Sequence, residues 1–579
     1  MDIYFDIETN PITDWMHLSD LKELRSFAVA IEDEPARTVS LEEGIALLNM
    51  ADTLIGHNAI GFDIPALKKL VPSFKRSHNI FDTAVACRLL HTNIADADYR
   101  DPTMPKELVG LQSLKAWGHR LKFPKTDGGD FEAGPKLDEY CRNDVELVRV
   151  LARDLLKHPA KAFKALDLEM RFARIIKQQE RMGIPFNVKA AERLHAEIRK
   201  QMLEIEQQMQ SMFPPVVQER VSEKTGKKLK PKILTFNPGS RLQIADRLKD
   251  MHGWRPTEFT PDGRPKVDET VLQSLPYPEA KVLAEYLTLG KRLGQLADGD
   301  EAWLKVVTPK GRIHGRVNTN GAITGRCTHS RPNMAQVPTE PAYRALFAAP
   351  KGKVMVGADA SGLELRCLAH YLGGWDGGEY AKAVTTGDIH WTNALAFGLT
   401  TDKVMDKNNS AHKQARNQAK GAIYALIYGA GNEKLGMVLG GDKRTGAKAR
   451  ANFESKVPAY LRLKETVTRN LGSRGWLKGL DGRPLYPRSE HAALNTLLQS
   501  AGAVVMKQAC VLAHMKLDAS KVEQVAAVHD EYQFITTPDY AEEVGRVVVQ
   551  AIRNAGTFFE MRCPLDGEYR IGANWSETH

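Results

Sequence analysis

AAVHDEYQFI, residues 526–535, decides the fold, because two apolar strand-like runs meet at the acidic centre His529-Asp530-Glu531. A third strand-like stretch, KVMVGADAS (residues 353–361), carries Asp359 near its end. Acids at the ends of separate strands can hold a pair of divalent ions, the arrangement that phosphoryl transfer requires. The fold is therefore expected to bring Asp359 and Asp530 together.

Side chains alternate along a strand, so Glu531 is predicted to point away from Asp530 and to share the side of His529. Glu531 is therefore not expected to bind a metal ion directly. His529 has two interpretations: a contact with the end of a bound strand, or a histidine satisfied within a turn.

RNQAKGAIYALIYG, residues 416–429, predicts a helix on which residues four apart form one slowly drifting stripe. The stripe consists of two cations and two aromatic rings, Arg416, Lys420, Tyr424 and Tyr428. It suits a nucleoside triphosphate, with the phosphates at the cations and the sugar and base at Tyr424. A solvated basic face with a half-buried aromatic end explains the stripe equally well.

The first 150 residues contain a second set of acids. Asp6 and Glu8 share one face of a predicted strand, GHNAIGFD (residues 56–63) supplies Asp63, and Tyr140 precedes Asp144 by one helical turn. Hydrolysis of a phosphodiester by two metal ions uses several carboxylates, and hard oxygen ligands favour Mg²⁺ or Mn²⁺. Asp82, between these segments, is expected to have a supporting structural role.

Charge and composition limit the classes of protein. Residues 1–150 hold 17 Lys and Arg against 25 Asp and Glu, whereas the whole chain has a net charge of +9. The basic remainder can neutralise nucleic-acid phosphates, although ordinary surface charge explains it as well. No run of about 18 apolar residues predicts a membrane span. The acidic N-terminus is not typical of a signal peptide, and six scattered cysteines fit a reducing cytoplasm.

As a set, these segments resemble the family A DNA polymerases, the DNA polymerase I class, with a DEDDy 3′–5′ exonuclease at the N-terminus. LEMRFARIIKQQERMGIPFN (168–187), FNPGSRLQIADRL (236–248), NGAITGRCTHSRPNMAQVP (320–338) and GANWSETH (572–579) extend the likeness over nearly the whole chain. The resemblance is strongest to the replicative polymerases of short-tailed phages. The resemblance implies an α/β RNase H-like exonuclease domain (1–155) followed by a mostly helical right-hand polymerase. The expected polymerase parts are a thumb (156–300, a long antiparallel helix pair with a basic tip at 213–240), a palm with a small antiparallel sheet (301–370 and 481–579) and helical fingers (371–480).

The resemblance also implies roles for individual residues. In the exonuclease, Asp6, Glu8, Asp63 and Asp144 would bind metal and Tyr140 would position water. In the polymerase, Asp359 and Asp530 would bind metal with the Ala360 carbonyl, and Glu364 would be the steric gate against a ribose 2′-hydroxyl. The remaining implied contacts are to the triphosphate (His390, Arg416, Lys420), the incoming sugar (Tyr424), the templating base (Tyr428), the minor groove (Arg326, Gln499) and the primer terminus (His529), with His579 near the active site.

The implied cofactor is Mg²⁺, two ions per active site, with Mn²⁺ as a substitute. The implied partners are primer–template DNA, dNTPs, a helicase–primase and a single-strand binding protein in the cytoplasm of a bacterial host, with no membrane. About two dozen residues separate the predicted helix ending at Met212 from the FNPGSR segment, too few for a folded thumb insertion, so thioredoxin is not an expected partner. The intervening lysines either grip DNA or form a solvated loop: Lys224, Lys227, Lys228, Lys230 and Lys232.

The leading hypothesis is thus a replicative, DNA-templated DNA polymerase with proofreading. A repair or translesion polymerase is a runner-up, disfavoured by the intact exonuclease acids. A stand-alone 3′–5′ exonuclease with a DNA-binding body is the alternative from a different class. An RNA polymerase is disfavoured if Glu364 is the gate. Tyr424 is followed by Ala425 where the family commonly has glycine, and this tyrosine predicts ready acceptance of dideoxynucleotides.

Overall fold

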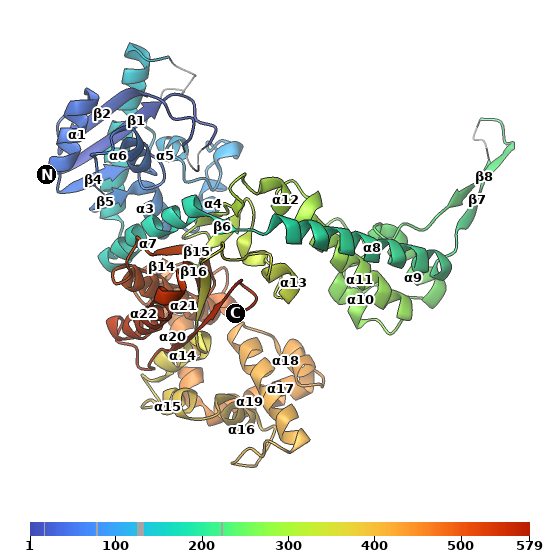
Figure 1. Cartoon of the computed structure of the whole chain (residues 1–579). Helices are drawn as coiled ribbons and strands as arrows, with labels where there is room; N and C mark the ends of the chain where they lie inside the picture. The colour runs from blue at the N-terminus through green and yellow to red at the C-terminus, as the bar shows by residue number, and fades with distance from the viewer. Residues whose placement is uncertain (15, 17, 77–78, 124–131, 222–223) are drawn as a thin grey trace. The chain divides into compact units, whose positions relative to one another are not determined.

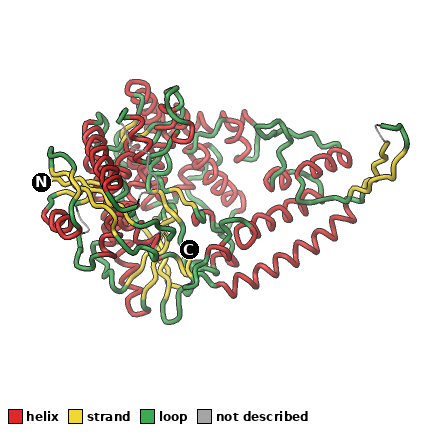
Figure 2. The backbone as a smooth tube through the Cα atoms, turned by 90° about the horizontal axis from the view of Figure 1, so that it is seen from above, coloured by secondary structure: helices red, strands yellow, loops and turns green. Residues whose placement is uncertain are grey.

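The computed structural model describes residues 1–579 except 15, 17, 77–78, 124–131 and 222–223 (Figure 1). The chain forms two compact units: unit 1 comprises Met1–Gly183, Gly315–Val337 and Ala349–His579, and unit 2 comprises Ile184–His314 and Pro338–Ala348. Helices predominate over short sheets, as the tube view shows (Figure 2). The finer division into thumb, palm and fingers remains a prediction.

The N-terminal part of unit 1 is built on a five-stranded sheet of order β3-β2-β1-β4-β5. Strand β1 pairs antiparallel with β2 and parallel with β4, and β4 pairs parallel with β5. These strands are β1 (Asp2–Thr9), β2 (Leu24–Ile31), β3 (Arg37–Thr38), β4 (Thr53–Gly56) and β5 (Ile80–Asp82). Helices of this part are α1 (Leu41–Met50), α2 (Asp63–Leu70), α3 (Thr83–Leu90), α4 (Ile94–Asp98), α5 (Leu114–Arg120) and α6 (Pro135–Lys157). Apolar residues of the strands and of α6 share one core.

A four-stranded antiparallel sheet of order β15-β16-β12-β17 forms the second core of unit 1. Its strands are β12 (Val354–Ala360), β15 (Val522–Val528), β16 (Glu531–Thr536) and β17 (Gly567–Gly572). Helices with buried residues in this core include α7 (Phe163–Met182), α14 (Leu363–Leu372), α21 (Glu490–His514) and α22 (Pro538–Phe558). The apolar stretches 353–361 and 526–535, which are predicted to form strands, thus belong to one small sheet.

The rest of unit 1 between α14 and α21 is mainly helical. Its helices are α15 (Glu379–Thr386), α16 (Ile389–Phe397), α17 (Ser410–Ile427), α18 (Asn432–Val438), α19 (Lys443–Lys456) and α20 (Pro458–Arg474), and one short strand pair, β13 (Leu477–Lys478) with β14 (Pro484–Leu485), follows them. Helices α18 and α19 cross closely at two glycines, since a Cβ on Gly436 would lie 1.8 Å from the Asp442 carbonyl oxygen. The strand pair β10 (Arg316–Asn318) and β11 (Thr328–Ser330) also belongs to unit 1.

Unit 2 contains α8 (Val188–Met212), α9 (Arg241–His252), α10 (Glu269–Ser274), α11 (Pro278–Leu293), α12 (Trp303–Val306), α13 (Pro341–Arg344) and the strand pair β6 (Ile184–Pro185) with β9 (Arg312–Ile313). The helix pair expected over residues 160–212 is therefore two helices, α7 and α8, that lie in different units. The basic tip expected at 213–240 contains two strands. Strands β7 (Val216–Val221) and β8 (Lys228–Leu234) form an antiparallel hairpin there, and lysine alternates with other residues in the first part of β8.

One described helix, α21, is long and apolar enough to span a membrane by length and composition. However, 83% of its apolar window is buried inside the protein. Within the described residues it is therefore a core helix, and its apolar character follows from its neighbours in unit 1.

Candidate active sites

The first candidate site lies at the end of the β12–β16 pair. In the strand register Asp359 lies opposite Glu531, and the Ala360 amide donates to the Asp530 carbonyl oxygen at 3.3 Å. Burial raises the pKa of Asp359 to about 7, and the charges of Asp530 and Glu531 add to this effect. Burial also raises the pKa of Asp530. The two acids predicted to meet are therefore neighbours, and their mutual repulsion is the electrostatic condition that a bound cation relieves.

The orientation of Glu531 follows from its place on β16 and not from alternation with Asp530. His529 and Asp530 form the turn between β15 and β16, and His529 has a positive φ of 56°. Strand alternation does not extend through a turn, so it cannot set Glu531 against Asp530. Glu531 instead points to the same face of the sheet as its cross-strand partner Asp359. His529 itself is exposed in the turn.

Glu364, the predicted gate, lies in the first turn of α14 and is bound by two other candidate residues. Its Oε1 accepts hydrogen bonds from the Tyr428 hydroxyl at 2.7 Å and from Nη2 of Arg326 at 3.3 Å. Burial, together with the Glu364 charge, raises the pKa of Tyr428 to about 12. The structure thus gathers a carboxylate, a phenol and a guanidinium from three distant segments beside the acid pair.

The stripe on α17 faces the first turn of α16. Nε of Arg416 donates to Asp388 Oδ2 at 2.7 Å, and burial with the charges of Arg416 and Lys420 lowers the pKa of His390. Burial raises the pKa of Tyr424, with added effects from Glu364 and Asp530. The stripe therefore runs from a cationic end to an aromatic end near the acid pair, as the four-residue spacing predicts.

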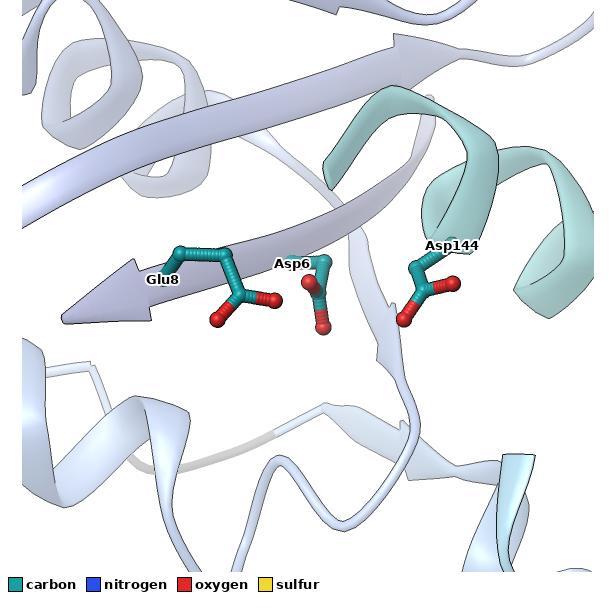
Figure 3. A group of neighbouring side chains, drawn as sticks. All are labelled: Asp6, Glu8 and Asp144. Atoms are coloured by element: carbon teal, nitrogen blue, oxygen red, sulfur yellow. The ribbon is translucent and has the colours of Figure 1, made fainter. Parts of the chain in front are cut away.

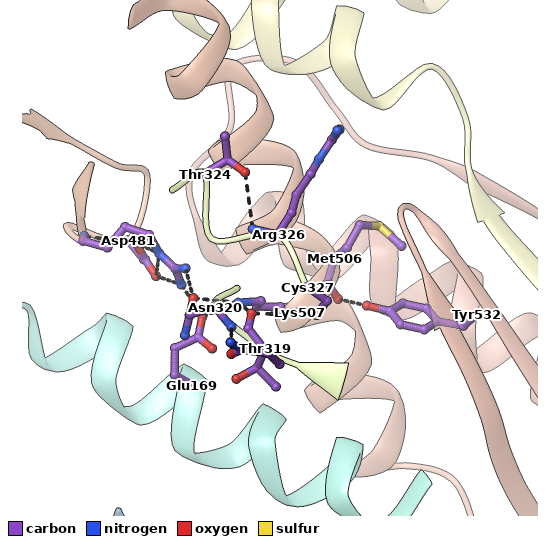
Figure 4. A network of polar contacts seen from close by, with 12 residues as sticks. Glu169, Thr319, Asn320, Thr324, Arg326, Cys327, Asp481, Met506, Lys507 and Tyr532 are labelled. Atoms are coloured by element: carbon purple, nitrogen blue, oxygen red, sulfur yellow. Dashed lines mark hydrogen bonds and ion pairs between the residues drawn. The ribbon is translucent and has the colours of Figure 1, made fainter. Parts of the chain in front are cut away.

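A buried ionic network supports the loop that carries Arg326 (Figure 4). Glu169 of α7 accepts from Lys507 of α21 at 2.6 Å and from Arg483 at 2.7 Å, while Arg483 also pairs with Asp481 at 2.7 Å. Lys507 donates further to two residues of the loop 319–326, the Thr319 carbonyl at 2.7 Å and Asn320 Oδ1 at 3.1 Å. Opposite charges paired in this way offset the cost of burial, and they fix the loop's position.

The second candidate site lies on the N-terminal sheet (Figure 3). Asp6 and Glu8 of β1 and Asp144 of α6 place one carboxylate oxygen each within 4.8 Å of one another. Asp63 approaches the same strand, since its Oδ1 accepts from the Ile7 amide at 3.3 Å. The pKa of Tyr140 is raised by burial and by the charge of Asp144. The structure thus clusters Asp6, Glu8 and Asp144 beside Tyr140, with Asp63 against the backbone of the same strand, and the acids offer only oxygen ligands.

Asp82 positions the turn that leads to Asp63. It is 1% exposed and caps α3 through the Ala84 amide at 2.9 Å. It also accepts from the amides of Asn58 at 2.9 Å and Ile60 at 3.0 Å. Asn58 has a positive φ of 62°, a conformation that these bonds stabilise. This is the structural role expected from the sequence.

A cavity of about 790 Å³ adjoins this turn. Its walls come from the N-terminal sheet domain, from α7 and from the β10–β11 pair, all within unit 1. Nη2 of Arg181 donates to the Gly61 carbonyl at 2.8 Å, and Glu180 accepts from the Val317 amide at 2.6 Å. Five basic residues line it: Arg88, Lys177, Arg181, Arg316 and Arg331. Sequence reasoning missed them, because they come from four separate segments with no shared motif.

The remaining predicted residues lie elsewhere. Gln499 is half-buried on α21. Lys227 and Lys228 lie at the turn end of the β7–β8 hairpin in unit 2, where Lys228 lies 3.5 Å from Glu219. His579 lies 2.8 Å from Glu531 through its Nδ1.

Comparison with known proteins gives one consistent result. The family model for DNA polymerase family A matches residues 189–577. The DNA-directed DNA polymerases of Enterobacteria phage T3 and Escherichia phage T7 are each 33% identical to this chain over 91% of it and 92% of their own length. DNA polymerase I of Pseudomonas aeruginosa is 26% identical over 98% of this chain and 65% of its own.

Solved structures share this fold. The POL domain of Pol1 from M. smegmatis, solved in complex with DNA primer-template and dNTP, superposes with a TM-score of 0.77 at 20% identity, covering 100% of this chain and 96% of that one. The likeness therefore extends over both units, beyond the residues that the family model matches. The chain belongs to DNA polymerase family A and is a DNA-directed DNA polymerase.

Proposed function

We propose that this polymerase is replicative and proofreads: it adds dNTPs to a primer 3′-hydroxyl at the Asp359–Asp530 site and removes mispaired 3′ nucleotides at the Asp6–Glu8–Asp144 site. The observation that carries the proposal is the presence of two separate acid sites in one chain. Family membership argues against the alternative of a stand-alone exonuclease with a DNA-binding body.

Asp359 and Asp530 are proposed to hold two Mg²⁺ ions, with the Ala360 carbonyl as a further ligand and Mn²⁺ as a substitute. The fit rests on the oxygen donors and on the raised pKa of Asp359, which burial and then the charges of Asp530 and Glu531 cause. When bound, the ions would lower the pKa of the primer 3′-hydroxyl and neutralise charge on the triphosphate. The chain's own residues fix the positions of both reactants.

The nucleotide is proposed to lie along α17. Arg416, Lys420 and His390 would bind the triphosphate, and Tyr424 and Tyr428 would lie at the sugar and the templating base. Asp388 pairs with Arg416 at 2.7 Å. A triphosphate carries more charge than one carboxylate, so it can replace Asp388 as the partner of Arg416.

Glu364→Ala is expected to raise ribonucleotide incorporation about 10- to 100-fold relative to deoxynucleotide incorporation. Glu364 is held by Tyr428 and Arg326, so its side chain is fixed rather than free to yield to a 2′-hydroxyl. Single-nucleotide extension with paired ribo- and deoxynucleotides measures the ratio. An unchanged ratio would remove Glu364 from the gate.

Tyr424→Phe is expected to lower dideoxynucleotide use about 10- to 1,000-fold relative to deoxynucleotide use. The Tyr424 hydroxyl can substitute for the missing 3′-hydroxyl, and phenylalanine keeps the ring without that oxygen. Competition between dideoxy- and deoxynucleotides in primer extension measures the change. Equal discrimination by the two proteins would contradict this role.

In the exonuclease, Asp6, Glu8, Asp63 and Asp144 are proposed as ligands of two metal ions, and Tyr140 as the residue that orients water. The basic cavity beside Asn58 and Phe62 supports the assignment, because it offers a path for the phosphates of a frayed primer strand. The N-terminal sheet with its flanking helices is proposed to be an RNase H-like domain.

Other proposed contacts are with DNA and replisome proteins. Arg326 and Gln499 would contact the minor groove, and His529 the primer terminus. Lys227 and Lys228 on the hairpin would contact backbone phosphates. A helicase–primase and a single-strand binding protein in a bacterial cytoplasm are proposed partners, and thioredoxin is not.

A 5′-labelled primer annealed to a longer template tests both activities in Mg²⁺. With all four dNTPs the primer should lengthen to the end of the template, and without dNTPs it should shorten from its 3′ end. Lengthening without any shortening would defeat the proofreading half of the proposal.

A further inference from the structure

The β15-β16-β12-β17 sheet has two different faces. Tyr532 and Phe534 of β16 point into the helical core of unit 1. The alternate residues Glu531 and Gln533 point to the other face, which also carries Asp359. Side chains on this second face are therefore the immediate surroundings of the polymerase acids.

The segment Ala573–His579 packs on that second face. A Cβ on Gly357 would lie 2.2 Å from the Thr578 carbonyl oxygen and 2.5 Å from Nε2 of Gln533, so only glycine allows this approach. Trp575 is 1% exposed, and the Ala573 carbonyl accepts from the Ala349 amide at 2.8 Å. The segment is thus fixed against β12 two residues from Asp359.

Glu531 is the point where the segment and the sheet are joined. It is 5% exposed, and its Oε1 accepts from the indole Nε1 of Trp575 and from Nε2 of Gln533, each at 2.5 Å. Its Oε2 lies 2.8 Å from Nδ1 of His579. Gln533 is oriented in turn by Thr578, whose hydroxyl donates to its Oε1 at 2.8 Å. Both carboxylate oxygens of Glu531 therefore have partners within the protein.

This arrangement separates Glu531 from its two neighbouring acids. Asp359 lies opposite it and Asp530 precedes it in the chain. A Glu531 carboxylate released from its donors could rotate toward the same ions as Asp359 and Asp530. It could also shift the turn that carries Asp530, because the two residues share a peptide bond.

We propose that Trp575 and Gln533 are positioning residues of the polymerase site, which hold the Glu531 carboxylate against Ala573–His579 so that, of the three neighbouring acids, only Asp359 and Asp530 face the metal pair. The inference rests on the proposed two-metal function of those two acids. Its basis is the hydrogen bonding and close packing around Glu531.

Trp575→Phe removes the indole donor but keeps an aromatic ring, and Gln533→Met removes the amide donor at similar length. Each is expected to lower the single-turnover rate of nucleotide addition about tenfold, with the KM for dNTP within about twofold of the native value. The Mg²⁺ concentration for half-maximal extension should rise severalfold. Removal of nucleotides from single-stranded DNA, a reaction of the other site, should not change.

Two measurements separate positioning from folding. Trp303→Phe is the matched control, since Trp303 is 2% exposed and packs against Phe186 and Phe347 within unit 2, whereas both acid sites belong to unit 1. Mn²⁺ binding, followed by electron paramagnetic resonance with Asp6→Ala present to remove the exonuclease acid, should weaken in Trp575→Phe and Gln533→Met but not in Trp303→Phe. This readout does not depend on turnover.

Unchanged extension and unchanged Mn²⁺ binding in both variants would overturn the proposal. Equal loss of both activities with a lowered Tm, or the same losses in Trp303→Phe, would also overturn it by showing a merely structural role. If native extension itself does not depend on divalent ions, the two-metal assignment fails instead. These results are distinguishable in one set of assays.

Discussion

Asp530→Ala will abolish primer extension and leave degradation intact, whereas Asp6→Ala will abolish degradation and leave extension intact. Each substitution removes an acid from one site. The other site is built around a different sheet and keeps all of its own acids. We expect losses of about 10³-fold or more in the affected reaction, because phosphoryl transfer relies on charge neutralisation by the bound ions. Gel assays of one labelled primer, with and without dNTPs, measure both rates.

The control for this prediction is Asp138→Ala. Asp138 lies on α6 near Asp144 in sequence, but its Oδ1 accepts from the Ser26 hydroxyl, and it is not one of the clustered acids. It should leave both rates within about threefold of the native values. Loss of both activities in Asp530→Ala would show that the acid maintains the fold rather than one reaction.

Much of the candidate site could be predicted because it follows local rules. Asp6 and Glu8 share a face of β1 because side chains alternate along a strand, and Tyr140 and Asp144 lie one turn apart on α6. The stripe on α17 follows from helical spacing in the same way. In each case neighbours in the sequence set the geometry.

Sequence patterns do not decide the structure where its geometry depends on distant segments or on a turn. The orientation of Glu531 is set by the turn at His529-Asp530 and by Trp575, 44 residues further along the chain. The sequence does not predict the strands of the β7–β8 hairpin, because lysines and proline hide the partial alternation of β8. Its residues are largely exposed, so no buried face reveals the alternation.

The pairing of Lys507 with Glu169 could not be predicted either, since 338 residues separate them. Each residue alone is typical of a solvated helix surface. Only the packing of α7 on α21 makes both of them buried, and burial then requires them to pair. Burial of this kind is a property of the assembled core and has no local signal.

Asp63→Asn will stabilise the metal-free protein at pH 8 while abolishing degradation of the primer. Asp63 is 5% exposed, and burial together with the charges of Asp82 and Glu8 raises its pKa to about 8. An unfolded aspartate has a pKa near 3.9, so between about pH 4 and pH 8 the folded chain binds a proton that the unfolded chain does not. Stability of the metal-free protein must therefore fall as the pH rises through this window.

Asparagine cannot ionise, so the gain in the free energy of unfolding of Asp63→Asn over the native protein should be absent near pH 4. It should grow to roughly 2–5 kcal/mol at pH 8. Thermal unfolding in EDTA, followed by circular dichroism from pH 5 to pH 8, measures the difference. Asp82→Asn is the contrasting control. Burial raises the pKa of Asp82 as well, but Asp82 accepts backbone amides through both oxygens, so replacing one oxygen by an amide donor should destabilise the protein near pH 5, where Asp63→Asn has little effect.

Divalent ions should reverse the order of stability. Mg²⁺ or Mn²⁺ favours the ionised form of Asp63, so either ion should raise the Tm of the native protein at pH 8 and raise that of Asp63→Asn much less. A native protein that is more stable than Asp63→Asn in EDTA at pH 8 would contradict the argument. A buried carboxylate that destabilises the protein without metal, and whose unfavourable charge only bound metal compensates, serves the reaction rather than folding.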